Sequence, residues 1–184
     1  MNATHQANVY QRTNVTVLDT DSALNYYLSS GLQAANISLG LPLFGKSFEN
    51  TTGLAQPFDG VGPGGPVLAG DVQQNGSWYY SSLPRAGATV FYDDIAKASY
   101  SYDPAALELI SYDDPQSATF KAQYAVARGL KGTFFFEARG DRPAGSNDSL
   151  VGTTAVALGV PTNDTNNLFY PTSQYNNIRN PAML

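Results

Sequence analysis

The sequence contains no cysteine and a single histidine, His5, among 184 residues. Without cysteine, neither disulfide bonds nor thiolate metal sites can form. One histidine is too few for a histidine-rich metal site. A Ser-His-Asp triad would have to use His5, which lies in a polar N-terminal stretch that we expect to be a loose loop. We therefore expect no metal and no other cofactor.

Charged residues are also scarce, at 14% of the chain against about a quarter in ordinary soluble domains. The formal net charge is −5. With no basic stripe to displace counterions, we expect no nucleic-acid partner. No apolar run approaches the roughly 20 residues of a membrane span, so we expect no membrane partner. The surface must instead be neutral and polar, which suits an uncharged ligand such as a carbohydrate.

Asparagine is plentiful and often followed by serine or threonine two positions later. Seven such Asn-x-Ser/Thr motifs occur, at Asn2, Asn14, Asn36, Asn50, Asn75, Asn147 and Asn163. This motif accepts N-linked glycans on secreted proteins. The sequence therefore predicts a secreted, extracellular glycoprotein.

Two nearly continuous apolar segments, 36–48 and 131–138, read as strands buried on both faces, as in a parallel sheet. Each follows a predicted helix. The first helix, in residues 19–31, is given Asp21 as its N-cap, and the second, in residues 113–130, begins after Asp114. Residues 77–113 contain several short strand signals, and residues 148–159 indicate a last helix. A helix connecting two parallel strands indicates a βαβ unit that carries an insertion.

Six segments resemble the C-terminal half of secreted fungal chitinases of glycoside hydrolase family 18. They agree in order and spacing over residues 5–160: "HQAN" at 5–8, "ISLGLPLFGKSFENT" at 37–51, "PFDGVG" at 57–62, "ASYSYDPAALELISYDDPQSATFKAQY" at 98–124, "GLKGTFFFEARGD" at 129–141 and "DSLVGTTAVALG" at 148–159. Each motif alone is a weak signal, and together they are specific.

The resemblance implies an α+β fold: the remnant of a (β/α) barrel, with its last two parallel strands and their helices, carrying a small α+β chitinase insertion domain. Residues 1–48 and 114–160 correspond to the barrel remnant. Residues 49–113 correspond to the insertion domain, which walls one side of the sugar groove in the family. Residues 161–184 are expected to be an extended C-terminal tail.

The resemblance also shows what the sequence lacks. The family hydrolyses chitin with a raised-pKa acid at the end of an Asp-x-x-Asp-x-Asp-x-Glu motif. The nearest match here, Asp19-Thr-Asp21-Ser-Ala23, has alanine at the glutamate position and is better explained as a helix N-cap. Glu137 with Asp141 is the only alternative acid pair beside the expected groove. We therefore expect no catalytic residues and no hydrolysis by this chain alone.

The groove positions of the family are altered in this sequence. Phe136 stands where the family carries tryptophan under the reacting sugar, and Phe44-Gly45-Lys46 replaces its Tyr-Gly-Arg. Phenylalanine can still stack on a sugar face, whereas lysine lacks the bidentate fork of arginine. The residues expected to bind carbohydrate are Phe44, Lys46, Phe58, Trp78, Tyr79, Tyr80, Phe136 and Glu137.

These observations favour an inactive, lectin-like protein that binds chitin fragments or other N-acetylglucosamine-containing glycans. Two alternatives remain open. Two barrel strands without neighbours expose apolar edges, which predicts a homodimer that covers residues near 37–45 and 131–137 and could be the chain's whole role. The chain could also be a chitinase fragment that is active only with its missing half.

Overall fold

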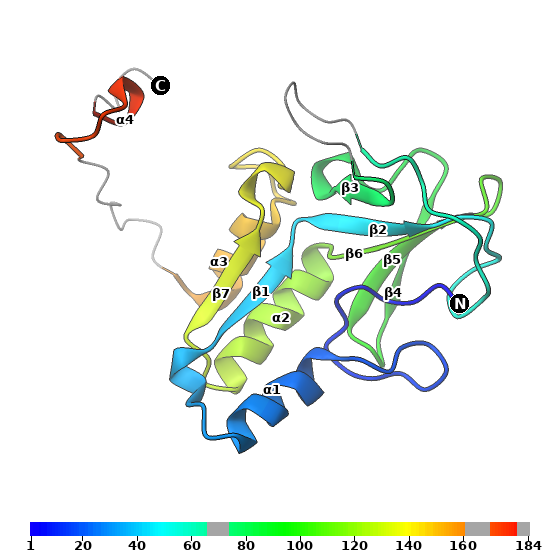
Figure 1. The fold of residues 1–184 in the computed structure, drawn as a ribbon, viewed down its shortest axis with the longest axis horizontal. Helices are drawn as coiled ribbons and strands as arrows, with labels where there is room; N and C mark the ends of the chain where they lie inside the picture. Colours follow the sequence, from blue (N-terminus) through cyan, green and yellow to red (C-terminus); the bar gives the residue numbers. More distant parts are fainter. Residues whose placement is uncertain (66–73, 161–169, 180–184) are drawn as a thin grey trace.

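The computed structural model describes residues 1–65, 74–160 and 170–179. Strands β1 (Ser38–Pro42) and β7 (Gly132–Phe136) form a two-stranded parallel sheet, in register from Ser38 opposite Gly132 to Pro42 opposite Phe136 (Figure 1). We call this the barrel pair. The prediction of two parallel strands at these positions is confirmed, but their predicted burial on both faces is wrong, because Phe134 and Phe136 of β7 are 54% and 66% exposed.

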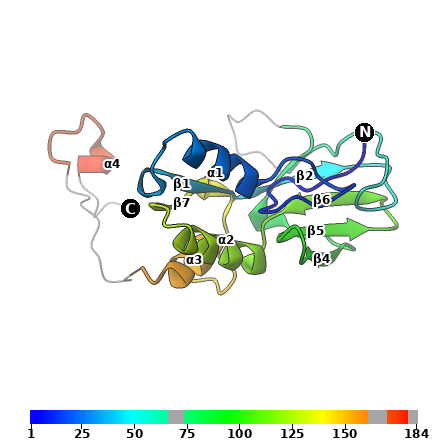
Figure 2. The ribbon, with the colours of Figure 1, turned by 90° about the horizontal axis from the view of Figure 1, so that it is seen from below.

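Three helices accompany the barrel pair: α1 (Thr20–Ser29), α2 (Pro115–Ala127) and α3 (Leu150–Leu158). Figures 1 and 2 show α2 and α3 together beside the barrel pair, with α1 beside the start of β1. Asp114 caps α2 as predicted, accepting a hydrogen bond from the Ser117 amide at 2.9 Å while the Ser117 hydroxyl accepts one from the Asp114 amide. This reciprocal capping fixes where α2 begins.

The predicted cap of α1 is wrong by two residues. Asp19, not Asp21, has the extended backbone of an N-cap and accepts a hydrogen bond from the Ser22 amide at 2.7 Å. The carboxylate of Asp21 instead accepts from the Tyr124 hydroxyl at 2.6 Å and from Arg128 at 2.7 Å. Asp21 therefore ties α1 to α2 and is not free to cap its own helix.

A second sheet of five antiparallel strands adjoins the barrel pair, in the order β3-β2-β6-β5-β4. Its strands are β2 (Phe44–Phe48), β3 (Ser77–Tyr79), β4 (Thr89–Asp93), β5 (Ala98–Asp103) and β6 (Glu108–Tyr112). The segment 36–48, expected to be one buried strand, is thus two strands in two sheets. The sequence placed the boundary between the barrel remnant and the insertion domain after residue 48. In the structure, the chain passes from the two-stranded to the five-stranded sheet at Leu43, between β1 and β2.

Short elements complete the described chain: three 3-10 helices (Ala34–Asn36, Tyr80–Ser82 and Ala138–Gly140) and helix α4 (Asn176–Arg179). Of the tail expected to be extended, residues 161–169 and 180–184 lie outside the described residues, and residues 170–179 include α4. In the described residues, no helix has the length and apolar character needed to cross a membrane.

The main hydrophobic core lies between the two sheets and α2 and α3. It contains Leu41, Leu43, Trp78, Tyr80, Leu83, Ile110, Tyr112, Ala118 and Leu150. A smaller core of Val9, Leu24 and Tyr124 joins the N-terminal segment to α1 and α2. The barrel pair and the five-stranded sheet are therefore held together by side chains buried in one common core.

The N-terminal segment, residues 1–18, is a loop as expected but is not loose. Its backbone donates from Gln6 to the Ser111 hydroxyl at 3.0 Å and from Val9 to the Ala96 carbonyl at 3.0 Å. The buried ring of His5 lies 2.9 Å from the Asp93 carboxylate through Nε2. This segment is therefore fastened to the five-stranded sheet.

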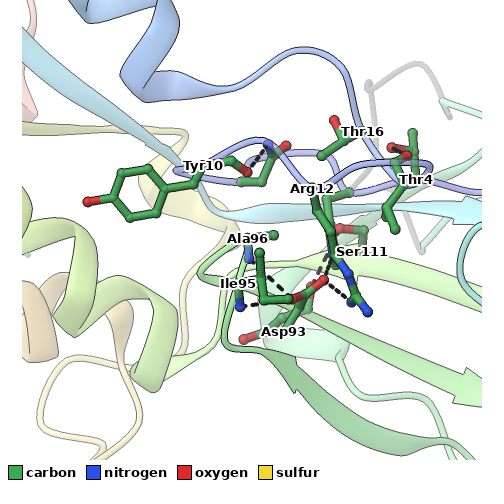
Figure 3. Close-up of polar contacts among 12 residues, drawn as sticks. Thr4, Tyr10, Arg12, Thr16, Asp93, Ile95, Ala96 and Ser111 are labelled. Carbon is green, nitrogen blue, oxygen red and sulfur yellow. Dashed lines mark hydrogen bonds and ion pairs between the residues drawn. The ribbon is translucent and has the colours of Figure 1, made fainter.

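Asp93 is the centre of this attachment. Figure 3 shows its carboxylate accepting from Arg12 and from the backbone amides of Ile95 and Ala96, the last two at 3.1 Å. Burial alone would raise the pKa of Asp93, but the hydrogen bonds from His5 and Arg12 outweigh it and leave the pKa below its usual value. The carboxylate therefore stays ionised, and both partners donate to it.

His5 is held in its neutral form. Burial lowers the pKa of His5 more strongly than the hydrogen bond to Asp93 raises it, and the nearby charges of Arg12 and Lys121 lower it further. Its Nδ1 atom is buried and has no hydrogen-bond partner in the described part of the chain. Protonation would place an N–H donor where no acceptor lies.

The first prediction concerns pH. His5 is the only histidine in the chain, and its unfolded form gains a proton below about pH 6.5 while the folded form resists protonation. The melting temperature should therefore fall as the pH is lowered from 7.5 to 5. Above this range, protonation of His5 should no longer reduce the melting temperature. Asp93, whose pKa is lowered, should lose its contribution only below about pH 4.

The measurement is thermal unfolding across this pH range for the wild type and His5→Gln. Glutamine can keep a donor towards Asp93 but does not titrate, so the variant should show a flatter profile. Parallel profiles for the two proteins would contradict the assignment.

The second prediction concerns Trp78, the only tryptophan of the chain. It is 9% exposed and packs in the main core, with the Arg85 guanidinium 4.2 Å from its ring centroid. Trp78→Ala should lower the free energy of unfolding by about 3–5 kcal/mol, since it opens a cavity in a packed core. Urea unfolding of this variant beside Tyr79→Ala, whose ring is only half-buried, would check it. Equal losses in both variants would show that Trp78 is not a core residue.

Candidate functional site

The carboxyl ends of β1 and β7 meet the edge of the five-stranded sheet, and four of the predicted groove residues come together there. Phe136 ends β7 and is 66% exposed. Its ring lies 6.4 Å from that of Phe44, at 79°. Tyr79 lies opposite Phe44 in the β2–β3 register and donates from its hydroxyl to Glu137 Oε1 at 3.0 Å. We call Phe44, Tyr79, Phe136 and Glu137 the groove cluster.

Lys46 lies next to this cluster on the same face of β2 as Phe44, because side chains two positions apart share a face. Its ammonium is 5.2 Å from the Phe44 ring centroid and donates to the Ser77 hydroxyl at 3.2 Å. Lys46 therefore covers one side of Phe44 and extends the polar part of the cluster along β2.

The inner face of the barrel pair continues the aromatic surface. Phe134 is 54% exposed, two residues before Phe136 on the same face of β7. Its ring lies over Gly40 of β1, where an added Cβ would approach the ring to 2.7 Å. Phe134 was not among the predicted groove residues, although its alternation with Phe136 on β7 was a signal that could have found it.

Phe58 is placed away from the cluster. It packs edge-on against Phe48 at 4.9 Å, at the other end of β2. Phe48 and Phe44 share a face of β2, so Phe58 lies on the same side of the sheet as the cluster. The structure therefore does not bring Phe58 together with the other predicted groove residues.

Trp78 and Tyr80 do not present their rings to a ligand, which corrects the sequence interpretation. Trp78 pairs with Gly45 and points to the opposite face from Tyr79, into the main core. Tyr80 is 2% exposed and donates from its hydroxyl to the Asp148 carbonyl at 2.7 Å. Burial raises the pKa of Tyr80 to about 12, against the lowering effect of Arg142.

Other carboxylates, and Asp141 of the predicted acid pair, have structural partners. Asp113 accepts from Lys121 at 2.6 Å through both oxygens, in a buried ion pair. Asp141 accepts from the Ser149 hydroxyl and the amides of Leu150 and Val151, at the start of α3. The Asp141 carboxylate is therefore engaged by the start of α3, whereas the Glu137 carboxylate accepts from Tyr79.

The described residues contain no group of three or more His, Asp and Glu side chains that could hold a metal ion. His5 and Asp93 form a buried pair, but the unpaired Nδ1 of His5 lacks the serine that a triad would need. The groove cluster presents one exposed aromatic ring (Phe136), one phenol (Tyr79) and one carboxylate (Glu137).

Comparisons with known proteins agree with this arrangement. The family model described as "Glycosyl hydrolases family 18" matches residues 1–141. A relative from Metarhizium robertsii named "Endochitinase 1" is 46% identical over 178 residues, which is 95% of this chain and 40% of that protein. The chain thus spans about 40% of the length of this curated relative.

Solved structures show the same relationship. A chitinase from Bacillus thuringiensis is 27% identical, with a TM-score of 0.75 over 89% of this chain and 30% of that one. A class V chitinase from Nicotiana tobaccum, solved in complex with NAG4, is 26% identical, with a TM-score of 0.72 over 86% of this chain and 44% of that one. The fold is α+β, and it is part of the barrel fold of these chitinases. The chain belongs to glycosyl hydrolase family 18.

Proposed function

We propose that the groove cluster binds N-acetylglucosamine oligomers and that this chain does not hydrolyse them by itself. The observation that carries the proposal is the hydrogen bond from Tyr79 to Glu137 beside the exposed ring of Phe136. This bond joins the end of β7 in the barrel pair to β3 in the five-stranded sheet. The Tyr79–Glu137 pair and the Phe136 ring are therefore held on one surface.

The chemistry of the cluster suits a neutral sugar. An exposed aromatic ring provides a flat apolar surface for the C–H face of a pyranose, as it does for other stacked partners. Glu137 provides acceptor oxygens for hydroxyl and acetamido N–H groups at the ring edge, and the Tyr79 hydroxyl, whose proton is donated to Glu137, provides a further acceptor. The relative solved with NAG4 supports this substrate class for the proposal.

The absence of hydrolysis is proposed from the sequence of this chain. Family 18 chemistry needs a protonated acid at the end of its Asp-x-x-Asp-x-Asp-x-Glu motif, and the 184 residues contain no such motif. Glu137 is exposed, and Asp141 is used at the start of α3. The groove cluster contains one carboxylate, Glu137, which accepts from Tyr79, so binding without turnover is the expected behaviour.

Secretion as a glycoprotein is the localisation that we propose. Four motif asparagines have exposed side chains without a hydrogen bond in the described residues: Asn14, Asn36, Asn75 and Asn147. Asn163 lies outside the described residues. These four positions are the ones most open to glycan attachment, since their amide groups are not engaged elsewhere.

A second candidate is an active chitinase in which further chain completes the barrel. The chain spans about 40% of its curated relative, and β1 and β7 each pair only with the other among the described strands. Additional strands on these two edges would cover Phe134 and could supply the acid. Alternatively, a second copy covers the same surface and the chain is a homodimer.

The third prediction tests the groove cluster. Calorimetric titration with chitotetraose, run beside a hydrolysis assay, should show binding without product. Phe136→Ala should weaken binding by about tenfold, because the loss of one stacking surface is worth about 1–2 kcal/mol. Tyr79→Phe should weaken it less, by about the value of one hydrogen bond.

Tyr26→Ala is the matched control, since Tyr26 is an equally exposed aromatic residue on α1. Its affinity should equal that of the wild type. Product release by the wild type would reject the inactive assignment, and equal binding by Phe136→Ala and Tyr26→Ala would reject the groove cluster as the site.

The fourth prediction separates the two ways of covering the barrel pair. If a second copy covers it, light scattering should give a dimer mass that falls to a monomer in Phe134→Glu, because a buried carboxylate disfavours the interface. Val156→Glu, on the exposed side of α3, is the control and should remain a dimer. A wild-type chain that stays monomeric at all concentrations would contradict the homodimer.

A further inference from the structure

A shallow cleft of about 360 Å³ lies between α2 and the segment that follows β4, and the proposed function does not use it. Tyr92, Asp94 and Lys97 line it on one side. Gln116, Phe120 and Gln123 line it from α2, together with Thr119. The spacing of these α2 residues, at i, i+4 and i+7, places them on one face of the helix.

The cleft lies on the other face of the five-stranded sheet from the groove cluster. Lys46 pairs with Ser111, Ser111 with Tyr100, and Tyr100 with Phe91, so these four side chains share the groove face. Tyr92 follows Phe91 on β4 and therefore points to the opposite face. A ligand in the cleft would not contact the groove cluster.

The polar groups of the cleft are available to a ligand. In the part of the chain that the structure describes, the side-chain amides of Gln116 and Gln123 and the hydroxyl of Tyr92 have no hydrogen-bond partner. Gln116 and Gln123 are two helical turns apart, about 10 Å along the axis of α2. Each amide offers an acceptor and two donors, which can satisfy a pair of neighbouring hydroxyl groups.

The charges of the cleft are matched and favour a neutral ligand. The Lys97 ammonium donates to Asp94 at 2.6 Å and lies 5.2 Å from the Phe120 ring centroid. Burial raises the pKa of Tyr92 to about 12, and the nearby carboxylates of Asp94 and Asp114 raise it in the same direction. Tyr92 is therefore an uncharged donor at neutral pH, between a closed ion pair and two amides.

We infer that this cleft is a second carbohydrate site, which takes a neutral mono- or disaccharide along α2. Phe120 and Tyr92 form its apolar floor and wall, and Gln116 and Gln123 bind hydroxyl groups at its two ends. Its volume lies at the small end of the range for ligand pockets, which fits one or two sugar rings. The inference is independent of the groove cluster, because the two sites share no residue.

The test is a titration of the ¹⁵N-labelled chain with cellobiose and with chitobiose, followed by backbone amide shifts. Residues 92–97 and 116–123 should shift and saturate in the low millimolar range. The double variant Gln116→Ala, Gln123→Ala should weaken this binding by about tenfold, through the loss of two neutral hydrogen bonds. Alanine is a better helix former than glutamine, so α2 should stay folded in the variant, as its circular dichroism would show.

Phe136→Ala is the matched control and should leave the shifts of residues 92–97 and 116–123 unchanged. Shifts confined to residues near 79 and 136 would overturn the second site while leaving the groove cluster intact. Shifts in the cleft that persist unweakened in the double glutamine variant would also overturn it. Saturating shifts in the cleft with either sugar would support the inference, and the lack of any shift at the groove cluster with chitobiose would count against the proposed function.

Discussion

The backbone hydrogen bonds of Leu43 connect the barrel pair to the five-stranded sheet, and the position of the groove cluster depends on them. Its amide donates to the Phe136 carbonyl at 2.9 Å, and its carbonyl accepts from the Tyr80 amide at 3.0 Å. Its side chain is completely buried in the main core. A single residue between β1 and β2 thus fixes the end of β7, the end of β3 and the core at once, and the groove cluster lies around this residue.

Gly140, in the turn after β7, packs directly against the Leu43 carbonyl. A side chain at this position would collide with the Leu43 carbonyl, so the turn after β7 can close only on glycine. Asp141 follows immediately and accepts the hydrogen bonds that hold the start of α3. The strand end, the turn and the helix start are therefore coupled, which explains why Glu137 faces Tyr79 with a defined geometry.

Much of the fold could be predicted from the sequence because its signals are local. The Asp114-Pro115 start of α2 and the apolar runs of β1 and β7 depend on neighbours within a few residues. The caps of α1 show the limit: Asp19 and Asp21 are equally good by type, and only the distant partners Tyr124 and Arg128 decide between them. The attachment of His5 to Asp93 likewise spans 88 positions and leaves no local pattern.

The candidate site was predictable in composition but not in which rings face outward. Trp78, Tyr79 and Tyr80 are three consecutive aromatics, and a shift of one residue in the β2–β3 register would exchange the buried and the outward-facing side chains. The sequence could not choose between these registers. The pairing of Phe44 with Tyr79 sends Tyr79 outward and sends Trp78 into the core.

The alternation along β2 has a consequence for how the protein can change over generations. Phe44, Lys46 and Phe48 lie on the face of the proposed binding site, whereas Gly45 and Ser47 face the packed interior, where an added methyl at Gly45 would approach Ile110 to 2.7 Å. Substitutions at these five consecutive positions therefore meet two different structural constraints. If the proposed site binds a ligand, side chains at every second position could change its specificity while packing constrains the positions between them.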